Sequence, residues 1–363
     1  ALRRYAAEFE LSTPSDDEIL AIIREEASAW CQKNQQARIK TDKLALDRII
    51  MHLRGLPPAD VRKLARQFIH VDGVISHQDL PLISKNKMQI LDVDGVLQYE
   101  YSTESFAQVA GLENLKHWLN KRQHAFLTPS NTVDTPKGIL LLGVQGSGKS
   151  LAAKAVAGLW SLPLLRLDFG ALYNKYYGES EKNLRESLKL ADNMAPCVLW
   201  LDEIEKGIAG KNDDDGTSQR VLGTFLTWLS ERQRPVFIVA TSNNIANLPT
   251  ELIRKGRLDE IFFVDLPKPK VREEIFAIHL TKRKHDPALF DLPILAAASE
   301  GFSGAEIEQA IVAAAYSAQA QQQQLQTSAV LDELSHTKPI AIVKAESINA
   351  LRAWAEDRTV SAD

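Results

Sequence analysis

Residues 143–150 constrain the fold and the chemistry of this chain more than any other stretch. They read Gly-Val-Gln-Gly-Ser-Gly-Lys-Ser, which has the spacing G-x-x-x-x-G-K-[ST]. An apolar run at residues 139–142 precedes them, and helix-forming residues 151–159 follow. Glycines in such a loop let backbone N–H groups turn inward around phosphate oxygens, and the following helix directs its positive end toward them. The segment predicts a phosphate-binding loop between a buried strand and a helix.

This loop also predicts individual contacts to a nucleotide. Lys149 would reach the β- and γ-phosphates, and Ser150 would ligate Mg²⁺, so ATP and Mg²⁺ are the expected cofactors. The rest of the loop would surround the phosphates with backbone and side-chain atoms. The expected contacts are Gly143, Val144, Gln145, Gly146, Ser147, Gly148, Lys149, Ser150 and Leu151.

Two acidic residues, Asp202 and Glu203, directly follow the apolar run at residues 198–201. A ligand of an open α/β sheet binds beyond the carboxyl ends of the strands, so both carboxylates would lie beside the phosphate loop. Asp202 would hold Mg²⁺ through its water shell, and Glu203 would orient and deprotonate the attacking water. Glu205 is expected to be a structural or interface acid and not a second base.

Five apolar runs without alternation predict the fold class. They suit buried parallel strands that alternate with helices in an α/β core. The runs are residues 139–142, 164–167, 198–201, 236–240 and 261–264. Helical patterning resumes after residue 268, which predicts a C-terminal helical lid.

Composition excludes several classes of protein. The chain has 363 residues, 43 Lys+Arg, 47 Asp+Glu and a net charge of −4, with 45% hydrophobic residues. These values are ordinary for a folded protein and provide no global field for nucleic acid. No run approaches the ~18 apolar residues of a membrane span. The two cysteines, Cys31 and Cys197, suit a reducing compartment, so a cytoplasmic protein without membrane contact is expected.

Nucleic-acid binding is not expected, because the basic residues near the N-terminus are interrupted by acids. No aromatic platform for bases accompanies them. The residues concerned are Lys33, Arg38, Lys40, Lys43, Arg48 and Arg54.

From about Glu104 onward the chain resembles an AAA+ ATPase. Residues 109–113 (Val-Ala-Gly-Leu-Glu) look like the entry segment of that family, which implies that Ala110 and Gly111 flank the adenine. Residues 239–243 resemble the sensor-1 strand, which implies that Asn243 lies between Glu203 and the γ-phosphate.

The resemblance also implies contacts from the lid and from a neighbouring subunit. Residues 301–305 (Gly-Phe-Ser-Gly-Ala) look like the sensor-2 region, so Gly304 and Ala305 would approach the nucleotide, as would His279. Residues 252–259 resemble the arginine-finger segment, so Arg254 and Arg257 would act on the nucleotide of the next subunit in a homo-hexamer formed with ATP.

Residues 175–181 (Lys-Tyr-Tyr-Gly-Glu-Ser-Glu) look like the first pore loop of the family. The resemblance implies that Tyr176, Tyr177 and Gly178 grip an extended polypeptide, although tyrosines of the core near a turn fit the same pattern. Residues 207–216 fall where a second pore loop would lie, but their composition equally describes a mobile acidic loop.

The sequence departs from the family pattern at three points. Ser230-Glu231-Arg232 stands where many relatives have an Asp-Gly-hydrophobic signalling element, which puts the usual coupling between sites in doubt. Asn244 stands where relatives often have arginine. No His-Glu-x-x-His zinc site occurs, so no fused metalloprotease is expected.

Within the family the chain is most similar to the ycf-type AAA proteins of plastids and cyanobacteria and their bacterial homologues. The resemblance includes residues 111–126, 195–200, 259–267 and 348–355. It implies a plastid stromal location if the gene is plastid-encoded. In those relatives a degenerate ATPase-like module precedes the active one.

An internal repeat fits that organisation. Residues 55–61 (Gly-Leu-Pro-Pro-Ala-Asp-Val) resemble residues 301–307 (Gly-Phe-Ser-Gly-Ala-Glu-Ile), and the apolar positions that follow also correspond. Two ordinary amphipathic helices with similar starts would give the same pattern. The repeat predicts a lid-like remnant of an upstream module, and hence that the chain is part of a longer protein.

Four segments are therefore expected. The lid-like remnant spans residues 1–70, a linker of strand and turn spans 71–103, the AAA+ core spans 104–268, and the lid with the C-terminal helix spans 269–363. The leading functional hypothesis is an ATP-driven ring motor that remodels an unidentified protein substrate or works with an adaptor. The alternative is a nucleotide-gated scaffold or switch that threads no polypeptide.

Overall fold

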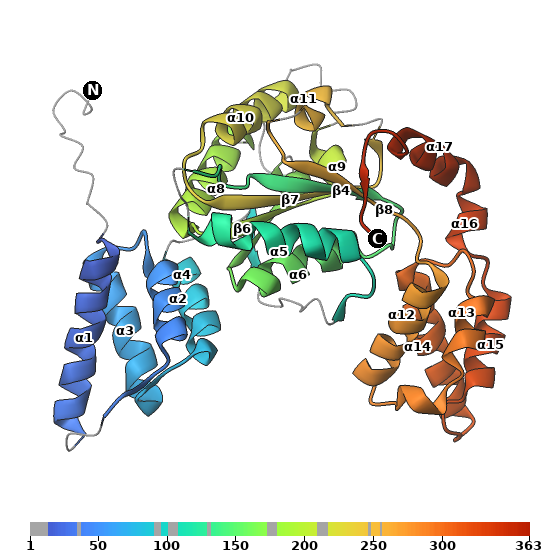
Figure 1. Ribbon diagram of the computed structural model, residues 1–363, viewed down its shortest axis with the longest axis horizontal. Helices are drawn as coiled ribbons and strands as arrows, with labels where there is room; N and C mark the ends of the chain where they lie inside the picture. Colours follow the sequence, from blue (N-terminus) through green and yellow to red (C-terminus); the bar gives the residue numbers. More distant parts are fainter. Residues whose placement is uncertain are drawn as a thin grey trace.

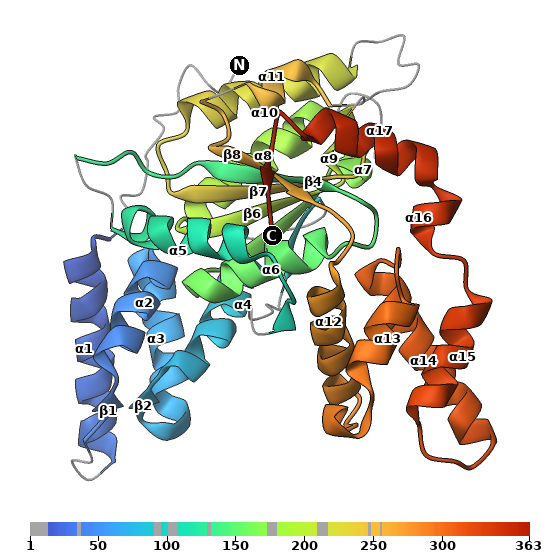
Figure 2. The same cartoon turned by 45° about the vertical axis from the view of Figure 1, so that its right-hand side comes forward.

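The computed structural model describes residues 14–34, 38–90, 96–100, 108–128, 132–172, 180–208, 217–245, 248–254 and 256–363. These residues form a helical N-terminal unit, a central α/β core and a C-terminal helical lid (Figure 1). The two helical parts lie on opposite sides of the core and both project below it (Figure 2).

The N-terminal unit contains α1 (Asp16–Lys33), α2 (Lys43–Leu53), α3 (Pro58–Asp72) and α4 (Leu80–Ile90). The unit also contains two short strands that pair in parallel, β1 (Lys40–Thr41) before α2 and β2 (Val74–Ile75) after α3. Helix α1 begins with a capping box, in which Ser15 and Glu18 satisfy each other's backbone N–H groups. The unit has a hydrophobic cluster of its own, which includes one face of α3.

The expected linker at residues 71–103 differs from what the structure shows. Helix α3 continues to Asp72 and ends at Gly73, and a capping box between Ser76 and Asp79 introduces α4. Leu80 and Ile83 of α4 pack into the N-terminal cluster, because they lie one helical turn apart on the same face. Residues 74–90 are thus part of the helical unit, while Leu97–Glu100 (β3) is an edge strand of the core sheet.

The core sheet contains the five predicted strands as its parallel centre. They are β4 (Gly138–Gly143), β5 (Leu164–Asp168), β6 (Cys197–Asp202), β7 (Val236–Ser242) and β8 (Glu260–Val264), in the order β5-β6-β7-β4-β8. Two strands beyond the prediction flank them: β3 pairs antiparallel with β5, and β9 (Val360–Ser361) pairs parallel with β8. The sheet therefore has seven strands among the described residues, because short edge strands leave no long apolar run in the sequence.

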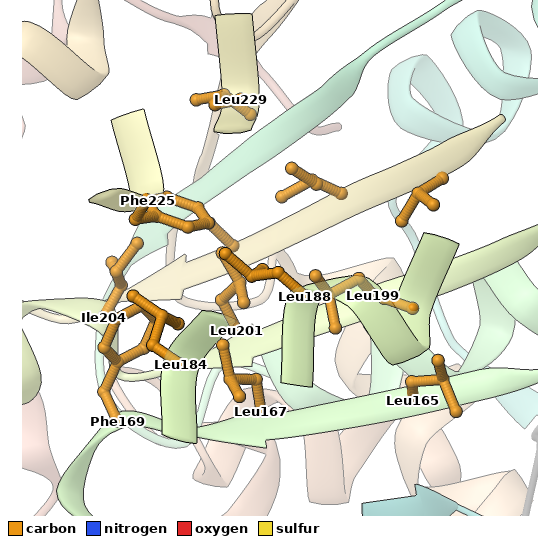
Figure 3. Packing of buried hydrophobic residues seen from close by; sticks show 14 of the residues in the cluster. Leu165, Leu167, Phe169, Leu184, Leu188, Leu199, Leu201, Ile204, Phe225 and Leu229 are labelled. Carbon is orange, nitrogen blue, oxygen red and sulfur yellow. The ribbon is translucent and has the colours of Figure 1, made fainter. Parts of the chain in front are cut away.

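Helices cover both faces of this sheet. One face packs against α7 (Phe169–Leu172), α8 (Ser180–Met194), α9 (Ile204–Ile208), α10 (Thr217–Glu231) and α11 (Thr250–Ile253). Leu184, Leu188 and Phe225 from α8 and α10 meet strand residues such as Leu199 and Leu201 there (Figure 3). The other face is covered by α5 (Glu113–Leu127) and α6 (Lys149–Trp160), with Trp160 and Phe126 stacked.

The lid contains α12 (Pro269–Lys282), α13 (Leu292–Ala298), α14 (Gly304–Ala320) and α15 (Thr327–His336) around a separate cluster. The chain then leaves the lid through α16 (Ile340–Val343) and α17 (Ala345–Ala355) and returns to the core as β9 (Figure 2). The segment expected at 269–363, the lid with the C-terminal helix, therefore also contains the edge strand β9. Within the described residues, no helix combines the length and the apolar character that crossing a membrane requires.

Candidate active site

A cavity of about 1110 Å³ lies between the core and the lid, at the carboxyl ends of the parallel strands. The core contributes the loop before α6, the acids after β6 and polar residues of β7, and the lid contributes α12 and the start of α14. The cavity is lined by residues of the phosphate loop and by Asp202, Glu203, Thr241, Asn243, His279, Gly304, Ala305 and Glu308. The topology thus brings together residues that are far apart in the sequence.

Lys149 is the most buried charged group at this cavity. Its Nζ donates hydrogen bonds to the carbonyl oxygens of Gly143 (2.9 Å) and Val144 (2.7 Å). Burial lowers the pKa of Lys149 to about 8, and the nearby acids Glu205, Glu203 and Asp202 oppose that shift. The ammonium group is thus hydrogen-bonded to carbonyl groups of its own loop. A bound phosphate, which is an anion, would be a stronger hydrogen-bond acceptor for it.

Glu203 and Asn243 face each other across the ends of two adjacent strands. The Asn243 Nδ2 group donates to Glu203 Oε1 at 3.0 Å, as the family resemblance implies. Glu203 has φ +46°, an uncommon backbone conformation for a residue with a side chain, and its N–H donates to Thr241 Oγ1 at 3.1 Å. The fold holds this carboxylate in a strained, defined position at the cavity.

Asp202 is held by two residues of neighbouring strands. Arg166 Nη2 donates to Oδ2 at 2.9 Å, and Thr241 Oγ1 donates to Oδ1 at 2.9 Å. Neither Arg166 nor Thr241 was predicted, because their contacts depend on strand register. Arg166 pairs with Trp200, two residues before Asp202 on the same face of β6, and Ala240 of β7 pairs with Leu201, which puts Thr241 beside Asp202. Lys206, also not predicted, forms an ion pair with Glu203 one turn along α9.

Glu205 supports the loop that carries Asn243. Its Oε1 accepts a hydrogen bond from the Asn243 backbone N–H at 2.9 Å, and its side chain is buried. The predicted structural role fits this contact. Its other oxygen, Oε2, has no hydrogen-bond partner among the described residues.

The lid touches the phosphate loop directly. The Ala305 N–H donates to the Gly146 carbonyl at 3.2 Å, and a Cβ on Gly146 would lie 2.9 Å from Ser303 Oγ. Ile275 and Ile278 of α12 add apolar wall to the cavity. These contacts place Gly304 and Ala305 at the cavity, while their predicted approach to a nucleotide stays a prediction.

His279 also lines the cavity, next to an ion pair on the lid. Its Nδ1 lies 3.3 Å from Glu308 Oε1, which also accepts from Arg283 Nη2 at 2.8 Å. Burial lowers the pKa of His279, whereas Glu308 acts in the opposite direction. Glu308 was not predicted from the sequence.

Val109, Ala110 and Leu112 of the predicted adenine segment line the cavity, together with Gln108 directly before it. Gly111 lies behind this wall, where its N–H donates to Glu274 Oε2 at 3.2 Å. Gly143 and Val144 are also behind the wall, where their carbonyl groups hold Lys149. These three residues support the cavity in this structure and do not line it.

The donor set fits a magnesium ion shared with phosphate. The exposed Ser150 hydroxyl and the Asp202 carboxylate face the same cavity. Among the described residues, no group of three or more His, Cys, Asp or Glu side chains could hold a metal alone. Mg²⁺ typically takes one or two protein oxygens and completes its shell with water and phosphate. The buried Ser147 hydroxyl, without a partner in the described part, is a further free polar group of the loop.

Arg254 and Arg257 are outside this cavity. Neither belongs to its described lining, and Arg257 Nη1 instead donates to the Glu251 carbonyl at 2.7 Å on the surface. The segment at Ser230–Arg232 closes α10 onto the start of β4, where Arg232 Nη2 donates to the Lys137 carbonyl at 2.5 Å. Tyr176, Tyr177, Gly178 and the segment 209–216 lie outside the described residues, so the pore-loop predictions stay predictions.

Comparison with known families gives two matches. Residues 139–266 match the family described as "ATPase family associated with various cellular activities (AAA)". Residues 17–93 match "SpoVK-like AAA ATPase, second domain". The second match extends over α4, in agreement with its packing in the N-terminal unit.

Individual proteins extend the similarity. "Uncharacterized AAA domain-containing protein ycf46" of Pyropia yezoensis is 42% identical over 86% of this chain and 64% of its own length. "Proteasome-activating nucleotidase" of Aeropyrum pernix is 40% identical over 51% of this chain and 47% of its own length. The crystal structure of the FIGL-1 AAA domain shares the fold, with a TM-score of 0.63, 22% identity and coverage of 76% of this chain and 96% of that one. The chain thus spans less than two thirds of the ycf46 relative it matches.

Proposed function

This chain carries an ATPase domain of the AAA family, and from that premise we propose that it hydrolyses ATP as one subunit of a ring that remodels a protein. The observation that carries the proposal is the Glu203–Asn243 pair, with Oε1 and Nδ2 3.0 Å apart, beside the loop that holds Lys149. A carboxylate base and an amide that orients it, next to a phosphate-binding loop, suit attack by water on a terminal phosphate.

In the proposed step Glu203 accepts the proton of a water that attacks the γ-phosphorus. The bond from that phosphorus to the bridging oxygen breaks, which yields ADP and phosphate. Lys149 leaves the carbonyl groups of Gly143 and Val144 and donates to phosphate oxygens instead. Ser150 and Asp202 would hold Mg²⁺, which when bound neutralises charge on the phosphate oxygens. Asn243 keeps Glu203 directed at the water.

The positions of Arg254 and Arg257 support a ring. Arg254 is exposed, Arg257 is half-buried, and neither lines the cavity of its own subunit, so the transition-state charge there lacks an arginine from this segment. An arginine supplied by a neighbour accelerates such reactions by about 10³–10⁵-fold. A head-to-tail contact that passes an arginine onward closes into a ring, and six subunits are the number that the family resemblance implies.

Remodelling of a polypeptide is the finer part of the proposal. Its support is the similarity to a proteasome-activating nucleotidase over the core and the tyrosine pair Tyr176 and Tyr177 in the sequence. The substrate class is an extended polypeptide, in the cytoplasm or in a plastid stroma. A nucleotide-gated scaffold would share the hydrolytic site but not the need for these tyrosines.

The test of hydrolysis is ATP turnover against protein concentration for wild type and Glu203→Gln. Wild-type turnover per subunit is expected to rise with concentration as rings form, and the variant should lose about 10²–10⁴-fold while it still binds ATP. Glu186→Gln, an exposed acid of α8 in a surface ion pair with Lys182, is the matched control and should behave as wild type. Turnover that ignores concentration and the Glu203 substitution contradicts the proposal.

Threading is tested separately with a Tyr176→Ala, Tyr177→Ala double variant. A motor that pulls polypeptide through its centre should keep basal ATP turnover and lose the unfolding of a tagged reporter protein. Unfolding that survives this variant would favour the scaffold.

A further inference from the structure

We propose that strand β9 and Asp363 position the turn at residues 110–112 and thereby set the affinity of the cavity for nucleotide. The proposal rests on the proposed function, since it concerns the same cavity. It assigns a positioning role to a segment that lies about 250 residues from that turn in the sequence but beside it in the fold (Figures 1 and 2).

The first helical N–H groups of α5 are satisfied by this distant segment. Leu112, the N-cap residue of α5, has no polar side chain, and its own N–H donates to Asp363 Oδ1. The N–H groups of Asn114 and Leu115 both donate to the Ala362 carbonyl, at 3.1 and 3.2 Å. Residues 362–363 thus replace the side-chain cap that a helix start requires.

The turn that these bonds hold is strained. Leu112 has φ +61°, which costs free energy for any residue with a Cβ, and Gly111 before it has φ +64°. A Cβ on Gly111 would lie 2.6 Å from Asp363 Oδ1 and 3.0 Å from Val271 Cγ1 of α12. Such a conformation persists only where the surroundings fix it, and here the fixing groups are Asp363 on one side and α12 on the other.

This turn is part of the cavity wall. Ala110 and Leu112 line the cavity, and the Gly111 N–H between them bonds to Glu274 of the lid helix α12. If the turn relaxes, the cavity wall is formed in only a fraction of the free molecules. The apparent affinity for nucleotide is then the intrinsic affinity multiplied by that fraction.

Strand β9 itself is firmly anchored to the core. Val360 and Ser361 pair with Phe262 and Phe263 of β8, and the Ala362 N–H donates to the Phe263 carbonyl at 3.0 Å. The Ala362 side chain is buried in the cluster beneath α5 and α6. Asp363 therefore reaches the turn from a fixed base.

Residues 344–352, which precede β9, also contact the core near the cavity. Lys344 Nζ donates to Gln145 Oε1 of the phosphate loop at 2.8 Å, and Arg352 forms an ion pair with Asp265 at 2.9 Å. Residues 344–363 therefore connect the far end of the lid to both walls of the cavity. Bound nucleotide should in turn stabilise the contacts of β9.

The test measures MgADP binding and the KM and kcat for ATP in Asp363→Ala. The dissociation constant for MgADP and the KM should both rise about tenfold, the effect of roughly one hydrogen bond to a charged acceptor. The kcat at saturating ATP should stay within about twofold, because Glu203 and the phosphate loop are untouched. Asp363→Asn keeps an acceptor oxygen and should recover most of the affinity.

Asp357→Ala is the matched control, since Asp357 is an exposed aspartate of the same returning segment. It should leave both constants unchanged. Wild-type affinity in Asp363→Ala overturns the inference, as does a parallel loss of kcat and thermal stability, which would show a merely structural role. Absence of MgADP binding by the wild type would instead contradict the proposed function.

Hydrogen exchange on the wild-type protein tests the same idea without a variant. MgADP should slow amide exchange in peptides that cover residues 108–115 and, at a distance, in peptides that cover residues 358–363. Slowing at the first segment alone would contradict the proposed link.

Discussion

The two helical bundles of this molecule begin their repeat helices alike but make different contacts with the core. In each bundle a glycine with φ +79° precedes a buried apolar residue and a helix: Gly55 and Leu56 before α3, and Gly301 and Phe302 before α14. The corresponding residues on the two helices are buried in both. They are Val61, Leu64, Ala65 and Phe68 on α3, and Ile307, Ala310, Ile311 and Ala314 on α14.

The contacts made by these starts differ. The start of α14 faces the phosphate loop through the bond from the Ala305 N–H to the Gly146 carbonyl. The start of α3 instead packs on the end of α8, where a Cβ on Gly55 would lie 2.5 Å from the Asn193 carbonyl oxygen. One bundle therefore borders the cavity and the other is docked on a remote part of the core.

Part-buried polar contacts link the N-terminal bundle to the end of α6 in the core. Arg48 Nη1 donates to Ser161 Oγ at 2.7 Å, and His52 Nε2 lies 3.4 Å from the Ser161 carbonyl at the end of α6. Within the bundle, the almost fully buried Lys87 of α4 donates to the Arg54 carbonyl after α2 at 2.6 Å. The same helical pattern can thus belong to a bundle that borders the cavity or to one that is docked away from it, and the surface that it meets decides which.

The largest expected effects on stability come from truncating a buried side chain in the hydrophobic core of each bundle. Phe68→Ala on α3 and Ile307→Ala on α14 each remove a fully buried side chain, at about 3–5 and 2–5 kcal/mol. Only Ile307→Ala should weaken nucleotide binding, since only α14 borders the cavity. Chemical denaturation together with MgADP titration checks both. Equal loss of affinity in the two variants would remove the distinction.

Next in size is the pair Gly55→Ala and Gly301→Ala. Each places a Cβ at φ +79° and against a close neighbour, the Asn193 carbonyl oxygen at 2.5 Å or Ala341 Cβ at 2.9 Å. The positive φ and the contact should cost about 1–3 kcal/mol in each. Limited proteolysis should show the N-terminal unit released in the first variant, and MgADP titration should show weaker binding in the second only. The opposite assignment would contradict the docking described here.

The smallest effect is a dependence of stability on pH that arises from His52. Burial, with Lys87 and Arg48 nearby, lowers the pKa of His52 to about 4, below its value of 6.5 in the unfolded chain. The unfolded state then binds more protons between these pH values, so stability is full above pH 6.5 and falls as pH falls toward 4. At pH 5.5 the loss should be about 1.4 kcal/mol.

His279 on the lid provides the comparison. Its pKa is also lowered, but Glu308 opposes the shift, so its dependence should be weaker. Unfolding free energies at pH 7.5 and 5.5 for wild type, His52→Gln and His279→Gln measure both contributions. If the unfolding free energy of His52→Gln depends on pH as strongly as that of the wild type, His52 is not the source of the pH dependence.

Local patterns in the sequence predicted the centre of the fold and of the site. The five parallel strands, the phosphate loop and the acids after β6 all depend on residues that are adjacent in the chain. The Glu203–Asn243 contact followed from the family resemblance and agrees with the 3.0 Å separation.

The features that could not be predicted from the sequence depend on pairing between residues that are distant in the chain. Arg166 reaches Asp202 because of the register of β5 and β6, and β9 exists only as a partner of β8. The linker expected at residues 71–103 rested on short apolar runs and on Gly73 and Gly95, but Leu80–Ile90 forms helix α4. Pro81 lies in its first turn, where proline is tolerated. Strand register and edge pairing leave no periodic signal in a single sequence.

In the proposed ring, each active site combines Glu203 of one subunit with Arg254 and Arg257 of the next. The most direct measurement mixes two inactive variants, Glu203→Gln and the double variant Arg254→Ala, Arg257→Ala, and follows ATP turnover. In an equal mixture, half of the sites keep Glu203 and half of their neighbours keep the arginines, so turnover should recover to roughly one quarter of the wild-type value. A mixture as inactive as its two components, or an arginine variant that is fully active alone, would contradict the claim.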